Sequence, residues 1–91
     1  MKSILNIAAY LFVSLDGLAD LRTKILNECK SQELKGTILL TGEGINMFLA
    51  GKESQLRGFL AWLKKDPRFE PIEAKESWSE DQPFKKMLVK L

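Results

Sequence analysis

The chain contains no histidine and only one cysteine, and both shortages exclude kinds of chemistry. Without histidine there is no imidazole base, no histidine metal ligand and no Ser-His-Asp triad. With Cys29 alone there is no internal disulfide and no cysteine cluster to hold a metal ion. A lone cysteine in a small domain is typical of a reducing compartment, so we expect a cytoplasmic protein.

Long apolar runs and a strong net charge are also missing. No stretch approaches the roughly 18 apolar residues that cross a membrane, and no membrane partner is expected. The apolar stretch at 4–13 is interrupted by Asn6 and Tyr10, which indicates a strand rather than a signal peptide. Fourteen Lys and Arg against twelve Asp and Glu leave a net charge of +2, too little to indicate a nucleic-acid partner by itself.

The 91 residues suit one domain over 1–91, because 45% are apolar and 29% are charged, an ordinary globular balance. Apolar periodicity predicts a helix wherever apolar residues recur every three or four positions, and a strand wherever short apolar runs lie between turns. The expected strands are 4–13, 37–40, 46–50, 72–78 and 84–91, and the expected helices are 15–32 and 53–65.

This order of elements predicts an α+β fold. A β-α-β-β-α-β chain with an extra C-terminal strand is the ferredoxin-like arrangement, with both helices on one face of an antiparallel sheet. On the first strand, Tyr10 and Phe12 should lie on the open face, joined by Phe48. The set expected to face the helices is Ile7, Ala9, Leu11 and Val13. The reversed facing is the alternative that the pattern leaves open.

Four collinear stretches resemble a known bacterial family. They are NIAAYLFVSLDGLADLR at 6–22, KGTILLTGEGIN at 35–46, FLAWLKKDPRF at 59–69 and QPFKKMLVKL at 82–91. Together they cover nearly the whole chain and resemble the N-terminal domain of the rhodanese-related tRNA uridine hydroxylases. One departure is Gly42, where the family usually has proline.

The resemblance implies an acylphosphatase-like fold, in agreement with the element order. It also implies a parent enzyme that adds a hydroxyl to C5 of the wobble uridine of certain tRNAs, using oxygen. In that family a following rhodanese domain carries the essential cysteine, and Cys29 does not correspond to it. We therefore expect tRNA and the rhodanese domain of the same polypeptide as partners, with no catalytic residue, metal or cofactor in this chain.

Acylphosphatase activity itself is not expected, because the loop after the first strand lacks an arginine. Asp16 stands where a phosphate anion would sit and would repel it, and Arg22 comes two helical turns later. Cys29 lies on the apolar stripe of the first helix with no histidine to activate it, which is typical of a core residue.

Two short basic segments are candidate RNA contacts, because clustered cations neutralise phosphates without reading sequence. These residues are Lys64, Lys65, Arg68, Lys85 and Lys86. Cations at the end of a helix also stabilise its dipole, and that simpler explanation stays open for the first three.

The open sheet face and the hairpin turn supply candidate contacts with another domain. Tyr10, Phe12 and Phe48 would meet the rhodanese domain, tRNA or a second copy in a weak homodimer. RNA-recognition domains share this element order and stack bases on such rings, but their basic and glycine residues are missing around Phe48. Glu43 and Asn46 would project from the turn, although a tight hairpin alone explains its glycines. The competing function is an interaction or ligand-binding module that dimerises through its open face.

Overall fold

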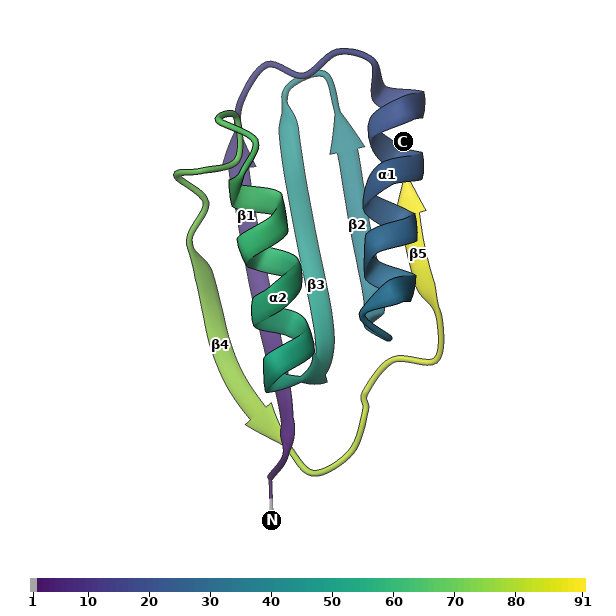
Figure 1. The fold of residues 1–91 in the computed structure, drawn as a ribbon, viewed down its shortest axis with the longest axis vertical. Coiled ribbons are helices and arrows are strands. Elements are labelled where there is room, and N and C mark those ends of the chain that lie inside the picture. Colours follow the sequence, from purple (N-terminus) through teal and green to yellow (C-terminus); the bar gives the residue numbers. More distant parts are fainter. Residues whose placement is uncertain (1) are drawn as a thin grey trace.

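The computed structural model describes residues 2–91 as a five-stranded sheet with two helices. Both helices cover the same face of the sheet (Figure 1), and the strand order is β4-β1-β3-β2-β5. The elements are β1 (Ile4–Phe12), α1 (Leu18–Ser31), β2 (Lys35–Thr41), β3 (Gly44–Lys52), α2 (Glu53–Lys64), β4 (Ala74–Ser79) and β5 (Met87–Lys90). The α+β fold predicted from the element order is confirmed.

The sheet is mixed, so the prediction of an antiparallel sheet is wrong for one strand pair. β5 pairs with β2 in parallel, whereas the other three pairs are antiparallel. The connection after β4 crosses to the far edge at the end of the sheet where β2 begins (Figure 1). β5 therefore starts beside the start of β2 and runs in the same direction.

The first helix begins at Leu18, three residues later than predicted. The backbone N–H groups of Val13 and Leu15 donate to the carbonyls of Glu43 and Gly42, so this segment follows the β2–β3 hairpin instead of coiling. Gly17 then adopts the left-handed conformation, with φ 57°, and forms the N-cap. Long-range hydrogen bonds thus delay the start of the helix beyond the predicted residue 15.

The two last strands are shorter than predicted at their starts. Residues 67–71 form turns, and Ile72 N–H donates to Phe69 C=O; the side chains of Phe69 and Ile72 are both buried in the core. Before β5, Gln82 Nε2 donates to Ala50 O at 3.0 Å and its Oε1 accepts from Phe84 N–H, so this stretch is held as a connection.

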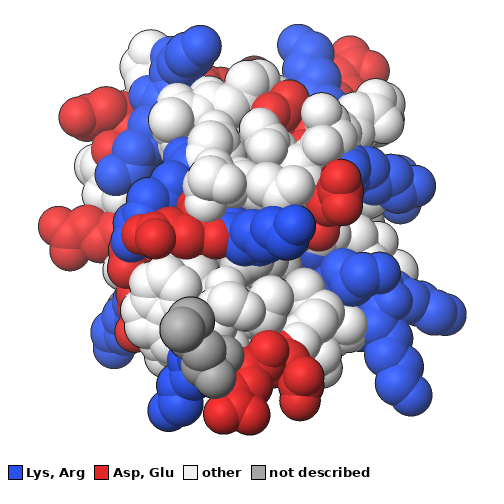
Figure 2. Space-filling view, turned by 60° about the horizontal axis from the view of Figure 1, so that its bottom comes forward, with Lys and Arg blue, Asp and Glu red and all other residues white. Residues whose placement is uncertain are grey.

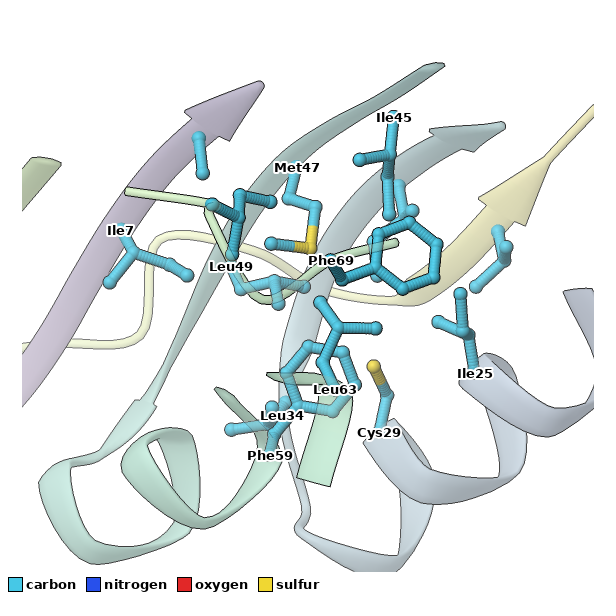
Figure 3. Packing of buried hydrophobic residues seen from close by; sticks show 14 of the residues in the cluster. Ile7, Ile25, Cys29, Leu34, Ile45, Met47, Leu49, Phe59, Leu63 and Phe69 are labelled. Carbon is cyan, nitrogen blue, oxygen red and sulfur yellow. The ribbon is translucent and has the colours of Figure 1, made fainter. Parts of the chain in front are cut away.

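The hydrophobic core lies between the two helices and the sheet, where buried side chains from both layers meet (Figure 3). Ile7 and Ala9 are buried there and Leu11 and Val13 partly so, which confirms the predicted facing of β1. Cys29 is fully buried in this core, as predicted. Burial, and secondarily the charge of Glu28, raise the pKa of its thiol to about 12.

Candidate nucleic-acid interface

The sheet face opposite the helices carries three aromatic rings on two neighbouring strands. Tyr10, Phe12 and Phe48 are 65%, 81% and 52% exposed. The rings of Tyr10 and Phe12 meet edge to face, with centroids 5.7 Å apart and planes inclined by 75°. Phe48 of β3 pairs with Ala8 of β1, and the next pair along the same face is Asn46 with Tyr10. The predicted facing of all three rings is confirmed; their partner is untested.

An open hollow of about 680 Å³ lies beside these rings. It is lined by all three rings, by Pro71 and Glu73 from the segment before β4, and by Lys75 within β4. Phe84, from the connection before β5, lines a neighbouring hollow of about 290 Å³ together with Phe48. The rings therefore border a depression large enough for a flat ligand.

The strand register also assigns the charged side chains to one face or the other, because partners in adjacent strands share a face. The charged residues in register with the rings are all lysines: Lys35 on β2, Lys52 on β3, Lys75 on β4 and Lys90 on β5. Carboxylate-bearing residues also line the hollows beside the rings: Glu43 lines a third, smaller one, and Glu73 lines the same large hollow as Lys75.

The acidic residue of the strands lies on the helix side instead. Glu76 of β4 is in register with Ile7, and its oxygens accept hydrogen bonds from both terminal nitrogens of Arg57 at 3.0 and 3.1 Å. Arg57 also binds Glu53 on its own helix at 2.8 Å. Among the charged residues within the strands, the lysines are therefore on the open face and the single glutamate is on the helix side.

The first basic segment lies at the end of α2, and its arginine is already occupied. Arg68 binds Asp66 through Nη2 at 2.7 Å and stacks over Phe69, with its central carbon 5.5 Å from the ring centroid. This hydrogen-bonded guanidinium holds the pKa of Asp66 below its ordinary value. Lys64 and Lys65 are exposed. Arg68 is therefore the least available of the predicted phosphate contacts.

The second basic segment lies at the opposite end of the molecule and gains a third lysine from β2. Lys35 Nζ is 3.5 Å from the carbonyl oxygen of Lys85, and Gly36 N–H donates to Lys86 C=O. Figure 1 shows that α2 ends far from the start of β5, so the structure does not unite the two segments. Blue side chains gather most densely on the side of α1 and β5 (Figure 2). Sequence reasoning missed Lys35 because 50 residues separate it from Lys85.

The predicted contacts of the hairpin separate into two places. Glu43 lies in the two-residue turn, where its N–H donates to Thr41 Oγ1 and its carbonyl accepts from Val13. Asn46 lies within β3, opposite Tyr10 on the open face. Asn46 therefore belongs with the aromatic rings rather than with the tip, although both residues line one small hollow of about 110 Å³.

Arg22, two helical turns after the loop that an acylphosphatase would use for phosphate, makes a structural contact. Arg22 Nε donates to the carbonyl oxygen of Val89 at 2.7 Å, which ties α1 to β5. Among residues 2–91, no three His, Cys, Asp or Glu residues form a group that could hold a metal ion. Neither helix in that range is long and apolar enough to cross a membrane.

Sequence comparisons give a family and its relatives. A family profile described as UPF0176 acylphosphatase like domain matches residues 4–91. A tRNA uridine(34) hydroxylase from Cupriavidus pinatubonensis is 56% identical over 87 residues, covering 96% of this chain and 31% of that protein. One from Bordetella parapertussis is 50% identical over 91 residues, covering 100% of this chain and 38% of that protein. The chain thus spans about a third of the length of these curated relatives.

Solved structures give the fold. The acylphosphatase from Bacillus subtilis superposes with a TM-score of 0.74 at 16% identity, covering 96% of this chain and 98% of that one. BlrP1 BLUF superposes with a TM-score of 0.79 at 16% identity, covering 100% of this chain and 66% of that one. Such low identities establish the shared fold and leave activity to the site residues.

Proposed function

This chain belongs to the family of the UPF0176 acylphosphatase-like domain, and from that premise we propose that it is an accessory domain of an enzyme that hydroxylates uridine 34 of tRNA. The observation that carries the proposal is the pattern of coverage. Relatives of that name match nearly the whole chain at 50–56% identity, yet the chain accounts for only 31–38% of their length. The remaining two thirds of those relatives are then available to hold the residues that carry out the hydroxylation.

The residues of this chain support an accessory rather than a catalytic role. Cys29 is buried, and its pKa of about 12 keeps the thiol protonated and unreactive at neutral pH. Arg22 is committed to a backbone carbonyl, and Asp16 occupies the loop that an acylphosphatase would use for phosphate. We assign the reaction to a rhodanese-type domain elsewhere in the polypeptide, and the whole enzyme to the cytoplasm.

The accessory role is to position tRNA or the rhodanese domain. Exposed lysines at both ends of the molecule, Lys64 and Lys65 at one and Lys85 and Lys86 at the other, are suited to phosphate contacts. The competing role, a module that dimerises through its open face, is favoured by the exposure of Phe12 and Phe48. Sedimentation of the isolated chain over a range of concentrations distinguishes a dimer from a monomer.

A domain exchange tests the proposal. In the Cupriavidus pinatubonensis hydroxylase, the matching segment is replaced by this chain, and hydroxylated uridine 34 is measured by mass spectrometry of tRNA. We expect the chimera to retain activity, a version without the segment to lose most of it, and the isolated chain to have none. Full activity of the version lacking the segment would contradict the proposal.

A further inference from the structure

The open sheet face exposes several large apolar side chains in one contiguous region, a feature typical of binding surfaces. Besides its three rings, Leu39 on β2 and Leu88 on β5 are 38% and 41% exposed and are in register with the same face. The apolar patch thus extends over β1, β3, β2 and β5. Covering it with a partner would remove apolar surface from water, which is favourable.

The charges around the patch indicate the chemistry of that partner. The cores of protein–protein interfaces are depleted of lysine, yet here Lys75 and Lys90 share the face with the rings. Lys35 and Lys52 lie at the end of the face where β2 begins, while Glu43 and Glu73 line hollows beside the rings. The four lysines in register with the rings outnumber these two glutamates. Aromatic rings interleaved with cations form the combination that binds single-stranded nucleic acid.

The geometry of the rings suits separate bases rather than one large ligand. Tyr10 and Phe12 are two residues apart on one strand, a spacing of roughly 6.8 Å. Because their planes are inclined by 75°, a base stacked on one ring meets the edge of the other. Phe48 adds a platform on the next strand, and the amide of Asn46 lies opposite Tyr10, where it can pair with the edge of a base.

We infer that the open face binds unpaired RNA nucleotides: Tyr10, Phe12 and Phe48 stack their bases, and Lys75 and Lys90 contact the adjoining phosphates. A duplex is excluded as the ligand because its bases are stacked inside and cannot reach the rings. The inference rests on the proposed function for the identity of the RNA as tRNA, and it specifies an unpaired loop as the part that is bound.

Fluorescence anisotropy of the purified chain measures the binding directly. The probes are a short fluorescein-labelled single-stranded oligoribonucleotide, a stem-loop displaying the same nucleotides in its loop, and a blunt duplex. We expect the single strand and the stem-loop to bind and the duplex to bind far more weakly. Equal affinity for the duplex would overturn the inference, because a duplex offers phosphates without accessible bases.

Exposed rings allow variants that leave the core intact. Tyr10→Ala and Phe48→Ala should each weaken binding to the single strand roughly tenfold, the range for loss of one stacked base. Trp78→Ala is the matched control, since Trp78 is 41% exposed but is in register with the helix-facing Leu5. Thermal unfolding of each variant verifies that it is folded. Equal losses in the control and the ring variants would overturn the inference.

Lysine variants separate stacking from charge. Lys75→Glu and Lys90→Glu should each flatten the salt dependence of binding by about one unit of slope, whereas Lys24→Glu on α1 should change it less. Tyr10 is the only tyrosine, so selective labelling of tyrosine gives one ring signal in an NMR spectrum. That signal should shift when the single strand is added, and an unchanged signal at saturation would overturn the inference.

Failure of this inference is distinguishable from failure of the proposed function. If the chimeric hydroxylase needs the domain but tolerates Tyr10→Ala with Phe48→Ala, only the inference about the open face is wrong. If ring variants abolish self-association of the chain without changing RNA affinity, the face is a protein interface and the inference is overturned. If the domain is dispensable for hydroxylation, the proposed function fails whatever the chain binds.

Discussion

The two faces of the sheet are built from the same strands, yet their side chains contact different surroundings. On β3, Met47 and Leu49 are fully buried against the helices, while Phe48 between them is 52% exposed. Phe59 and Phe69 are fully buried, while Phe12 is 81% exposed. A phenylalanine therefore stabilises the fold on one face and is available to a partner on the other. Because phenylalanine occurs in both settings, residue type does not decide whether a ring is buried. What decides it is whether the two helices cover the face on which the ring lies.

The largest expected difference between the faces is in the cost of removing a ring. Phe59→Ala should lower the free energy of unfolding by about 3–5 kcal/mol, because it leaves a cavity in the core. Phe48→Ala should lower it by less than about 1 kcal/mol, because half of that ring already contacts water. Urea denaturation measures both. Similar losses would show that the open face is part of the core.

The next difference appears at alkaline pH and concerns Cys29. In the unfolded chain the thiol ionises near its ordinary pKa of 9.0, but in the fold its pKa is about 12. Between these values the unfolded chain has released the proton and the folded one has not. The free energy of unfolding should therefore fall by about 1.4 kcal/mol per pH unit over this range.

The control for that prediction is Cys29→Ala, which removes the titrating group and leaves the other alkaline groups in place. The difference in free energy between the two chains, measured by urea denaturation at several pH values, should lose its slope below pH 9. A thiol reagent should label Cys29 only as fast as the chain opens. Rapid labelling at neutral pH would place the thiol outside the core.

Removal of two rings from the open face should have a small effect on folding. Tyr10→Ser with Phe12→Ser should lower the free energy of unfolding by about 1 kcal/mol, because both rings are mostly exposed. The affinity of self-association or of docking to a partner should fall by more than the stability of the fold does. Circular dichroism and sedimentation measure the two effects, and an unfolded double variant would contradict the assigned facing.

The smallest expected effect concerns the ion pair on the helix side. Arg57→Gln removes the hydrogen bonds to Glu76 and Glu53, all at exposed positions. The loss of stability should be slight and should vanish in high salt. Arg57 holds the pKa of Glu76 below its ordinary value of 4.5, so this contribution is present above pH 4.5 and is lost as the pH falls below it. Thermal unfolding at two salt concentrations checks the prediction, and an effect independent of salt would contradict it.

Local pattern was sufficient to predict the elements and the facing of the first strand. The stripe that includes Leu21, Ile25 and Cys29 recurs at helical spacing, and all three are buried where that stripe meets the sheet. The alternation around Tyr10 and Phe12 likewise held, because neighbouring side chains of a strand must point to opposite faces. Both features depend only on residues close together in the chain.

The candidate interface could be predicted only in part. Tyr10, Phe12 and Phe48 followed from alternation on two strands, but the association of Lys75 and Lys90 with them depends on which strands are neighbours. Arg68 is a candidate phosphate contact from its place in a basic segment, and only the structure shows that its guanidinium binds Asp66 and stacks over Phe69. Lys35 was missed because it meets Lys85 across the parallel β2–β5 pair.

The sequence by itself determined the element order, the buried stripe of each helix and the exclusion of histidine chemistry, because each depends on composition or local spacing. Only the tertiary structure decided where α1 begins, which way β5 runs and which charges surround the aromatic rings. These depend on backbone hydrogen bonds between distant segments, such as Leu15 to Gly42 and Gly36 to Lys86. A buried backbone N–H group must donate to an acceptor, even one on a distant segment. That requirement outweighs the preference of the local sequence for a helix or a strand.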